Sequence, residues 1–183
     1  MAAHIHTLAD YRDAIGQFTT YPEAGTGSHR ARRHVTLGVY GKMIGAVSQV
    51  YQTAEHDDAG VFTEGRLFDL KRQMGDSLWY ITRAIIEHGT RCAGLIWGRS
   101  LADLLPSGHV ELNTIEAWVS SPRTVVLTDF TDFQDVLALL HTLAFAAARH
   151  GWTLQDLAWA NVAKLTEHAG GHVLQGAGAL VAS

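Results

Sequence analysis

Apolar residues recur at steps of three and four in several stretches of the chain, a spacing typical of helices that bury one face. The longest such seam comprises Leu67, Leu70, Met74, Leu78, Ile81 and Ile85, and Gly89 follows it. A polar stripe runs beside the seam and comprises Asp69, Gln73, Asp76 and Tyr80. Because residues three or four apart share a helix face, this pattern predicts a helix with one apolar and one polar side that ends at Gly89.

Two further helices are predicted from their start signals. Thr7 is followed by Asp10, and Thr153 by Asp156, and a threonine with an acid three residues later typically caps a helix. The first of these helices carries the apolar stripe Leu8, Tyr11, Ile15 and Phe18. The last carries Leu154, Leu157 and Leu165 on one face, with Asn161 among them and Trp152 ahead of the cap. A buried amide needs hydrogen-bond partners, so we expect Asn161 to have them.

A helix is also predicted over about 36–52, where Tyr40, Met43, Val47 and Val50 share a face. Gly38, Gly41 and Gly45 fall within it, although each glycine weakens a helix by roughly 1 kcal/mol relative to alanine. Glycines at this density indicate close packing against another backbone, or room for a ligand. The basic run HRARRH at 29–34 is expected to lie in the loop ahead of this helix, where it either attracts phosphate groups or is simply solvated.

The stretch between Gly89 and Gly151 is less regular. Segments 110–119 and 123–130 are rich in β-forming residues and flank a Ser-Ser-Pro turn, which predicts a short β-hairpin. A further helix is predicted over 132–150. Because no long linker or low-complexity tract divides the chain, we expect one domain over residues 1–183.

Charge and composition narrow the classes of function. The net charge of −4 at pH 7 provides no general basic field for nucleic acid or an anionic membrane. The longest apolar run, 136–148, is interrupted by His141 and is too short to cross a bilayer. The single Cys92 allows no internal disulfide, and the histidines lack zinc-site spacing. We therefore expect a cytoplasmic protein that binds neither nucleic acid nor membranes.

Short motifs carry a resemblance to a known family. The sequence GDSLWY at 75–80 is similar to the G-D-v-L-W-Y signature of the MazG-like, dUTPase-related all-α nucleotide pyrophosphohydrolases. The segment GWTLQDL at 151–157, followed by NVAKL at 161–165, resembles that family's G-x-S-L-x-x-v and N-x-x-K-L ending. GVYG at 38–41 resembles the opening of its G-L-x-G-E-x-x-E helix.

The resemblance implies an all-α fold with a particular arrangement of the chain. A MazG-like four-helix core would comprise residues 7–89 and 151–170, and residues 90–150 would be an insertion that holds the short hairpin and the extra helix. The related folds commonly build their pockets from two subunits, so the resemblance also implies a homodimer.

The resemblance further implies four carboxylates that hold Mg²⁺. A hard cation prefers oxygen ligands, neutralises the phosphates and positions water for attack. The four family positions fall on Lys42, Gly45, Gln73 and Asp76, so only Asp76 keeps a carboxylate. Asp69, Asp132 and Asp135 are candidate substitutes, although the last two also fit the ordinary enrichment of acids at a helix N-terminus.

The leading hypothesis is therefore a nucleotide-binding protein that has lost hydrolysis. Lys42 would replace the metal as the counter-charge for phosphate, although an ammonium cannot activate water as Mg²⁺ does. The residues expected to contact a nucleotide or a related phosphorylated molecule are Lys42, Gln73, Asp76, Trp79, Tyr80, Asn161 and Lys164. No cofactor is expected under this hypothesis.

Two other functions remain open. An active pyrophosphohydrolase, which converts a nucleoside triphosphate to the monophosphate and pyrophosphate with Mg²⁺, requires substitute acids that converge on Asp76. A structural or partner-binding relic would make its contacts through the inserted segment, and Lys42 and Asp76 would then form only a structural ion pair. Charge reversal at Lys42 distinguishes this last possibility from the leading hypothesis.

Overall fold

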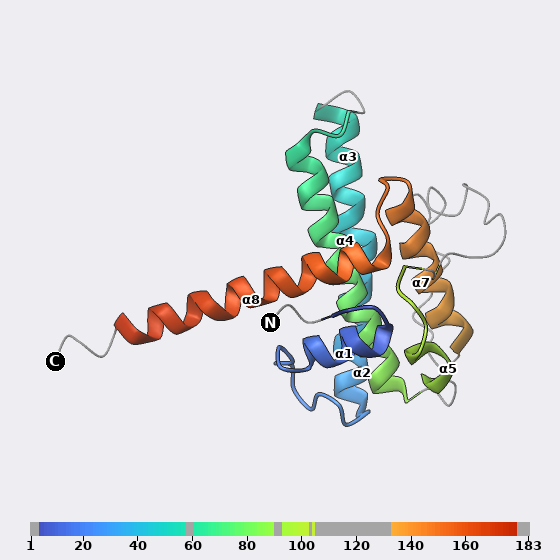
Figure 1. Cartoon of the computed structure of the whole chain (residues 1–183), viewed down its shortest axis with the longest axis vertical. Coiled ribbons are helices and arrows are strands. Elements are labelled where there is room, and N and C mark those ends of the chain that lie inside the picture. The colour runs from blue at the N-terminus through green and yellow to red at the C-terminus, as the bar shows by residue number, and fades with distance from the viewer. Residues whose placement is uncertain (1–3, 58–60, 90–92, 103, 105–132, 179–183) are drawn as a thin grey trace.

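Helices make up the fold of the computed structural model, which describes residues 4–57, 61–89, 93–102, 104 and 133–178 (Figure 1). In chain order they are α1 (Leu8–Gly16), α2 (His29–Val39), the π-helix η1 (Tyr40–Val47), α3 (Ser48–Asp57), α4 (Glu64–His88), α5 (Ala93–Trp97), α7 (Phe133–Ala148) and α8 (Leu154–Gly178). Across the described ranges the only β pairing is an isolated bridge between Thr7 and Ser100. The predicted all-α class is confirmed for these residues.

The long helix α4 is the centre of the fold, because α1, α2, η1, α3, α7 and α8 all pack against it. Figure 1 shows α8 crossing α4 and continuing away from the other helices. The seam residues Leu70, Met74, Leu78, Ile81 and Ile85 are fully buried, as predicted. Gly89 ends the helix in the left-handed conformation at φ 57°, which glycine adopts without steric cost.

Both predicted capping boxes are present. The Thr7 side chain accepts a hydrogen bond from the backbone N–H of Asp10, and the Asp10 carboxylate accepts one from the backbone N–H of Thr7. Thr153 and Asp156 form the same reciprocal pair at 2.8 and 3.2 Å before α8. Helix α1 ends at Gly16, earlier than its apolar stripe suggested, so Phe18 lies beyond the helix.

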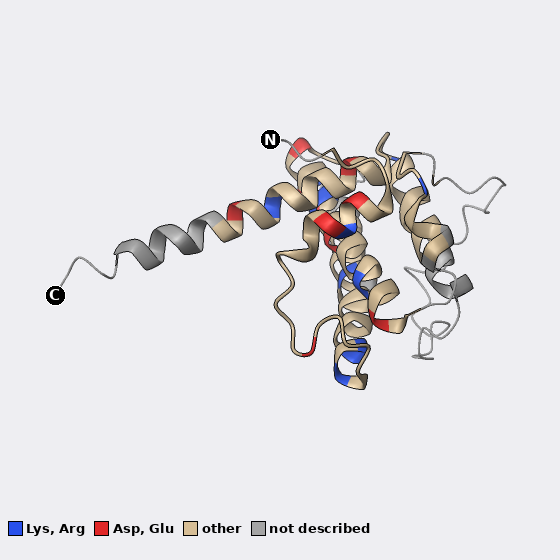
Figure 2. Cartoon of the chain, turned by 60° about the horizontal axis from the view of Figure 1, so that its bottom comes forward, with Lys and Arg blue, Asp and Glu red and all other residues tan. Residues whose placement is uncertain are grey.

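Helices α2, η1 and α3 form one continuous rod that is longer at both ends than the predicted helix over 36–52. Ser28 starts the rod, because its side chain accepts a hydrogen bond from the backbone N–H of Ala31. The expectation that the basic run 29–34 lies in a loop is therefore wrong. These residues form the first turns of α2, and Figure 2 shows their basic positions together at the lower end of the molecule. The middle of the rod, which carries Lys42, is a π-helix, a rare form that is frequent at functional sites.

Glycines let α4 approach its neighbours closely at two points. A Cβ atom at Gly38 of α2 would lie 2.0 Å from the Tyr80 ring, and one at Gly75 of α4 would lie 3.0 Å from the Leu157 carbonyl oxygen of α8. Of the three glycines in the predicted helix, Gly38 packs closely against the Tyr80 side chain and not against another backbone, whereas Gly41 and Gly45 meet nothing within 4 Å in the described part of the chain.

Only part of the region between α4 and α8 belongs to the described residues. Helix α7 agrees with the helix predicted over 132–150. The predicted hairpin at 110–130 and the side chain of Asp132 lie outside the described residues. Of the helices that the structure describes, none is both long and apolar enough to cross a membrane.

Candidate functional site

A pocket of about 430 Å³ opens between the loop after α1 and the helices α2, η1, α4 and α8. It is lined by Phe18, Thr20, Tyr21, Pro22, His34, Lys42, Asp76, Trp79, Tyr80, Asn161, Lys164 and Leu165. All the residues predicted from the sequence to contact a ligand are among them except Gln73, which hydrogen-bonds to Lys42. The fold thus brings the predicted residues together from η1, α4 and α8.

Asp76 lies at the centre of a charged cluster in this pocket. Its Oδ2 is 2.6 Å from Lys164 Nζ and 2.9 Å from Lys42 Nζ. Its Oδ1 accepts a hydrogen bond of 3.1 Å from Asn161 Nδ2. Asp76 is only 8% exposed, and these partners offset the cost of burying its charge. Two ammonium groups and one carboxylate leave one net positive charge in the cluster.

Tyr11 and Gln73 support the cluster from outside the pocket lining. The Tyr11 hydroxyl donates to Asn161 Oδ1 at 2.8 Å, which orients the Asn161 amide so that Nδ2 points at Asp76. Gln73 Oε1 accepts a hydrogen bond of 3.2 Å from Lys42 Nζ. Burial raises the pKa of Tyr11 well above its ordinary value, and the negative charge of Asp76 adds to the shift, so the hydroxyl stays protonated and can donate. The partners expected for Asn161 are therefore Tyr11 and Asp76.

We expect Tyr11→Phe to lower the free energy of unfolding by about 1–3 kcal/mol, because the buried Asn161 Oδ1 loses its donor while the aromatic ring is kept. Urea denaturation followed by circular dichroism measures the loss. Tyr51→Phe is the control, since the Tyr51 hydroxyl bonds to the partly exposed ring of His150 at 2.7 Å. Equal losses in the two variants would contradict a special role for the Tyr11 hydrogen bond.

Aromatic rings form another wall of the pocket. Tyr21 stacks on His34 with ring centroids 4.8 Å apart, and Trp79 meets Tyr80 edge to face at the same separation. Such rings provide the apolar surface on which planar groups, nucleobases included, stack. Trp79 Nε1 is buried without a hydrogen-bond partner among the described residues. An acceptor on a bound ligand is one way to satisfy that donor.

The side chains around Asp76 do not fit Mg²⁺. This ion is coordinated by oxygen at near-ideal octahedral geometry, usually through one or two carboxylates together with water and substrate phosphates. Here two ammonium groups already contact Asp76 Oδ2, and the positions where the resemblance implied further ligands hold Lys42, Gly45 and Gln73. Asp69 is exposed on α4 and does not line the pocket, and the side chains of Asp132 and Asp135 are outside the described part. Among the residues that are described, no three His, Cys, Asp or Glu side chains are placed to hold a metal.

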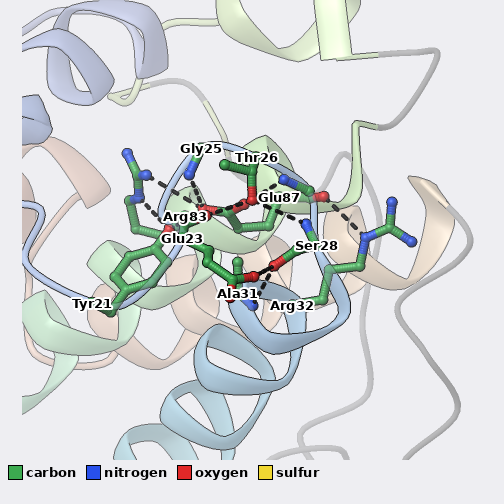
Figure 3. A network of polar contacts seen from close by, with 10 residues as sticks. Tyr21, Glu23, Gly25, Thr26, Ser28, Ala31, Arg32, Arg83 and Glu87 are labelled. Carbon is green, nitrogen blue, oxygen red and sulfur yellow. Dashed lines mark hydrogen bonds and ion pairs between the residues drawn. The ribbon is translucent and has the colours of Figure 1, made fainter.

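A second polar cluster, which we term the Glu87 network, fastens the loop between α1 and α2 to α4. Glu87 is 1% exposed, and its carboxylate accepts hydrogen bonds from the Tyr21 hydroxyl and from the backbone N–H groups of Gly25, at 2.6 Å, and Gly27, at 3.0 Å (Figure 3). Arg83 Nε donates to the Tyr21 hydroxyl at 2.9 Å, and its guanidinium lies 3.5 Å from Glu87. The network holds Tyr21 in the pocket wall.

The loop backbone is shaped to meet Glu87. Gly25 and Gly27 have φ angles of 80° and 65°, in the left-handed region that favours glycine. A Cβ atom at Gly27 would lie only 3.1 Å from the backbone carbonyl oxygen of Glu87. The same oxygen accepts a hydrogen bond of 3.2 Å from Arg32 Nε. One member of the basic run is thus engaged with the end of α4.

The Glu87 network was not predicted, although the sequence carries a signal for it. The polar stripe Asp69, Gln73, Asp76 and Tyr80 continues at the same steps of three and four to Arg83 and Glu87. Both are buried. The sequence pattern places His34 in a loop and gives no signal that Tyr21 or His34 lines the pocket.

Glu87 is expected to make the fold sensitive to acid. Burial by itself would raise the pKa of its carboxyl, but the hydrogen bonds from Tyr21, Gly25 and Gly27 and the charge of Arg83 outweigh burial and hold the pKa below its usual value of 4.5. A pKa that is lower in the folded chain than in the unfolded chain contributes stability above pH 4.5, and this contribution is lost as the pH falls through the folded pKa.

We therefore expect the free energy of unfolding to fall from about pH 5 to about pH 3, and to fall less in Glu87→Gln, which lacks the titrating group. Urea denaturation at a series of pH values measures both proteins. Parallel pH profiles for the two would show that Glu87 contributes nothing to the acid response.

The two clusters meet in one site. Asp76 and Glu87 lie on the same helix, and Tyr21 contacts Glu87 while it lines the pocket that contains Asp76. The arrangement can bind an anion beside a planar group without a metal ion.

Comparison of the chain with protein-family models, with curated proteins and with solved structures found no match.

Proposed function

We propose that this chain is a MazG-like protein that binds a nucleotide or a related phosphorylated small molecule without hydrolysing it. The observation that carries the proposal is the pairing of Asp76 with two lysines, Lys42 at 2.9 Å and Lys164 at 2.6 Å, inside a pocket with an aromatic wall. In the family that the sequence resembles, the position of Lys42 belongs to a carboxylate that binds Mg²⁺. A positive side chain in that position supplies the counter-charge itself.

The proposed binding mode uses both halves of the pocket. Phosphate oxygens accept hydrogen bonds from Lys42 and Lys164, since charge-assisted bonds of this type are the strong ones. The base or another planar group stacks on the rings of Tyr21, His34 and Tyr80. The pocket volume of about 430 Å³ lies within the range of small-molecule sites.

The proposal does not include hydrolysis, because the side chains around Asp76 do not fit the Mg²⁺ ion that usually drives this reaction. Mg²⁺ both neutralises phosphate charge and positions and activates the attacking water. An ammonium can do the first but not the second. The alternative of an active enzyme needs substitute acids beside Asp76, and the exposed Asp69 supplies none.

The homodimer implied by the family resemblance stays a prediction, which light scattering coupled to size-exclusion chromatography tests.

Calorimetry tests the proposal. The protein is titrated with ribo- and deoxyribonucleoside mono-, di- and triphosphates, first in EDTA and then in Mg²⁺, and the mixtures are separated by chromatography after long incubation. We expect binding in EDTA and no turnover in either buffer. Production of monophosphate and pyrophosphate that requires Mg²⁺ and disappears in Asp76→Ala would establish an enzyme instead. If no nucleotide binds, a structural or partner-binding role remains.

A further inference from the structure

We infer that the pocket selects a nucleoside monophosphate over the corresponding triphosphate. The inference rests on the proposed function, because it concerns the ligand of the same pocket. It is carried by the charges around Asp76 and by the N–H groups that this carboxylate leaves available on Lys42 and Lys164.

The charge in the pocket suits a single phosphate group. Among the lining residues, those with a formal charge are Lys42, Lys164 and Asp76 when histidine is counted as neutral. They sum to one positive charge. A phosphate monoester carries about −1.5 to −2 charges at pH 7, which the cluster balances to within about one charge. Each further phosphate adds negative charge that the lining does not offset.

The pocket offers no ligand for the magnesium ion that a triphosphate ordinarily carries. A bound triphosphate ordinarily keeps its metal between phosphate oxygens and protein carboxylates. In this pocket the carboxylate of Asp76 is held by Lys42 and Lys164, so a magnesium ion brought in with the ligand meets two positive charges. The metal of a magnesium–triphosphate complex therefore gains no protein ligand in this pocket, and the selection is tested on the metal-free nucleotides.

The N–H groups that remain on the two lysines also match one terminal phosphate. An ammonium has three N–H groups. Lys42 is engaged by Asp76 and Gln73, and Lys164 by Asp76, within the described residues. One N–H group of Lys42 and two of Lys164 remain, and a terminal phosphate presents three non-bridging oxygens to receive them.

Asp76 becomes a specificity-determining residue under this inference. Both lysine Nζ atoms lie within 2.9 Å of its Oδ2, so a phosphate bound to them is also close to a negative oxygen. The resulting repulsion grows with the charge of the ligand and therefore penalises a triphosphate more than a monophosphate. Asp76→Asn keeps the shape of the side chain, removes the repulsion and should relax the selection.

The test is calorimetry in EDTA with the mono-, di- and triphosphates of adenosine, guanosine, cytidine and uridine, on the full chain and on Asp76→Asn. For the best base, we expect the monophosphate to bind at least about tenfold more tightly than the triphosphate. In Asp76→Asn we expect that ratio to shrink to about threefold or less, because triphosphate affinity rises.

The outcomes separate this inference from the proposed function. A triphosphate that binds the unmodified chain as tightly as its monophosphate overturns the selection while nucleotide binding stands. The absence of binding by all of these nucleotides overturns both. Circular dichroism checks that Asp76→Asn is folded, and if it is not, the affinity ratio of the unmodified chain decides alone.

Discussion

Replacing Glu87 with alanine is expected to lower the free energy of unfolding by about 3–5 kcal/mol, because the substitution leaves a buried charge without its partner. Arg83 is 6% exposed and would lose the carboxylate at 3.5 Å. The backbone N–H groups of Gly25 and Gly27 would lose their acceptor at the same time. A domain is stable by only about 5–15 kcal/mol, so the variant should approach unfolding at room temperature. Urea denaturation followed by circular dichroism measures the loss.

Glu167→Ala is the matched control for this prediction. Glu167 is exposed on α8 and forms a surface ion pair of 3.8 Å with Arg72, so its loss should change the stability by no more than about 0.5 kcal/mol. If Glu87→Ala does not fold, Glu87→Gln keeps the side-chain shape and allows an intermediate loss to be measured. A loss in Glu87→Ala as small as that in Glu167→Ala would mean that the Glu87 network does not stabilise the fold.

The sequence predicts the helices best where the signal is local. The threonine–acid pairs at the starts of α1 and α8 form within four residues, so neither needs information about the rest of the chain. The apolar seam of α4 and its end at Gly89 are equally local. The start of α2 is harder to predict, because the residues after Ser28 are mostly basic and Ser28 itself follows glycines that are typical of a turn.

The charged and amide residues of the candidate site and the pairing of Lys42 with Asp76 could be predicted from the sequence, but the other contacts and the aromatic residues Tyr21 and His34 could not. The motifs at 75–80 and 161–165 predicted that Asp76, Asn161 and Lys164 contact one ligand. Lys42 was added because it falls on a metal-ligand position of the family that the sequence resembles. The hydrogen bond from Tyr11 to Asn161 joins residues 150 positions apart, and no sequence pattern predicts it. The same holds for Tyr21 and Glu87, which belong to different elements and meet only because the glycine-rich loop folds back onto α4.

One helix face connects the stability of this protein with its proposed binding. The polar stripe of α4 carries Asp76, which engages the lysines, and Glu87, which holds the loop bearing Tyr21. A loosened Glu87 network would therefore release one aromatic wall of the pocket while it leaves the lysine cluster in place. Glu87→Gln should accordingly weaken ligand binding even while the chain remains folded.

Lys42→Glu is expected to weaken nucleotide binding at least about 100-fold, because it removes a phosphate contact and reverses the charge at that point of the pocket. A hydrogen bond to a charged group contributes about 1.5–3 kcal/mol, and the substitution adds repulsion between the new carboxylate and the phosphate. It also replaces the ammonium that lies 2.9 Å from Asp76 with a second negative side chain. Calorimetry with the tightest-binding nucleotide measures the change. The titration contains EDTA, because two neighbouring carboxylates can bind Mg²⁺ and so restore a counter-charge.

Arg33→Glu is the control, since it makes the same change of charge at an exposed position of the same helical rod, outside the pocket lining. Water and salt screen an exposed charge that makes no contact with the ligand, so this variant should bind within about threefold of the unmodified chain. A selective loss in Lys42→Glu supports a phosphate contact by Lys42. If both variants bind as the unmodified chain does and both remain folded, Lys42 and Asp76 form only a structural ion pair between η1 and α4, and the phosphate must be bound elsewhere.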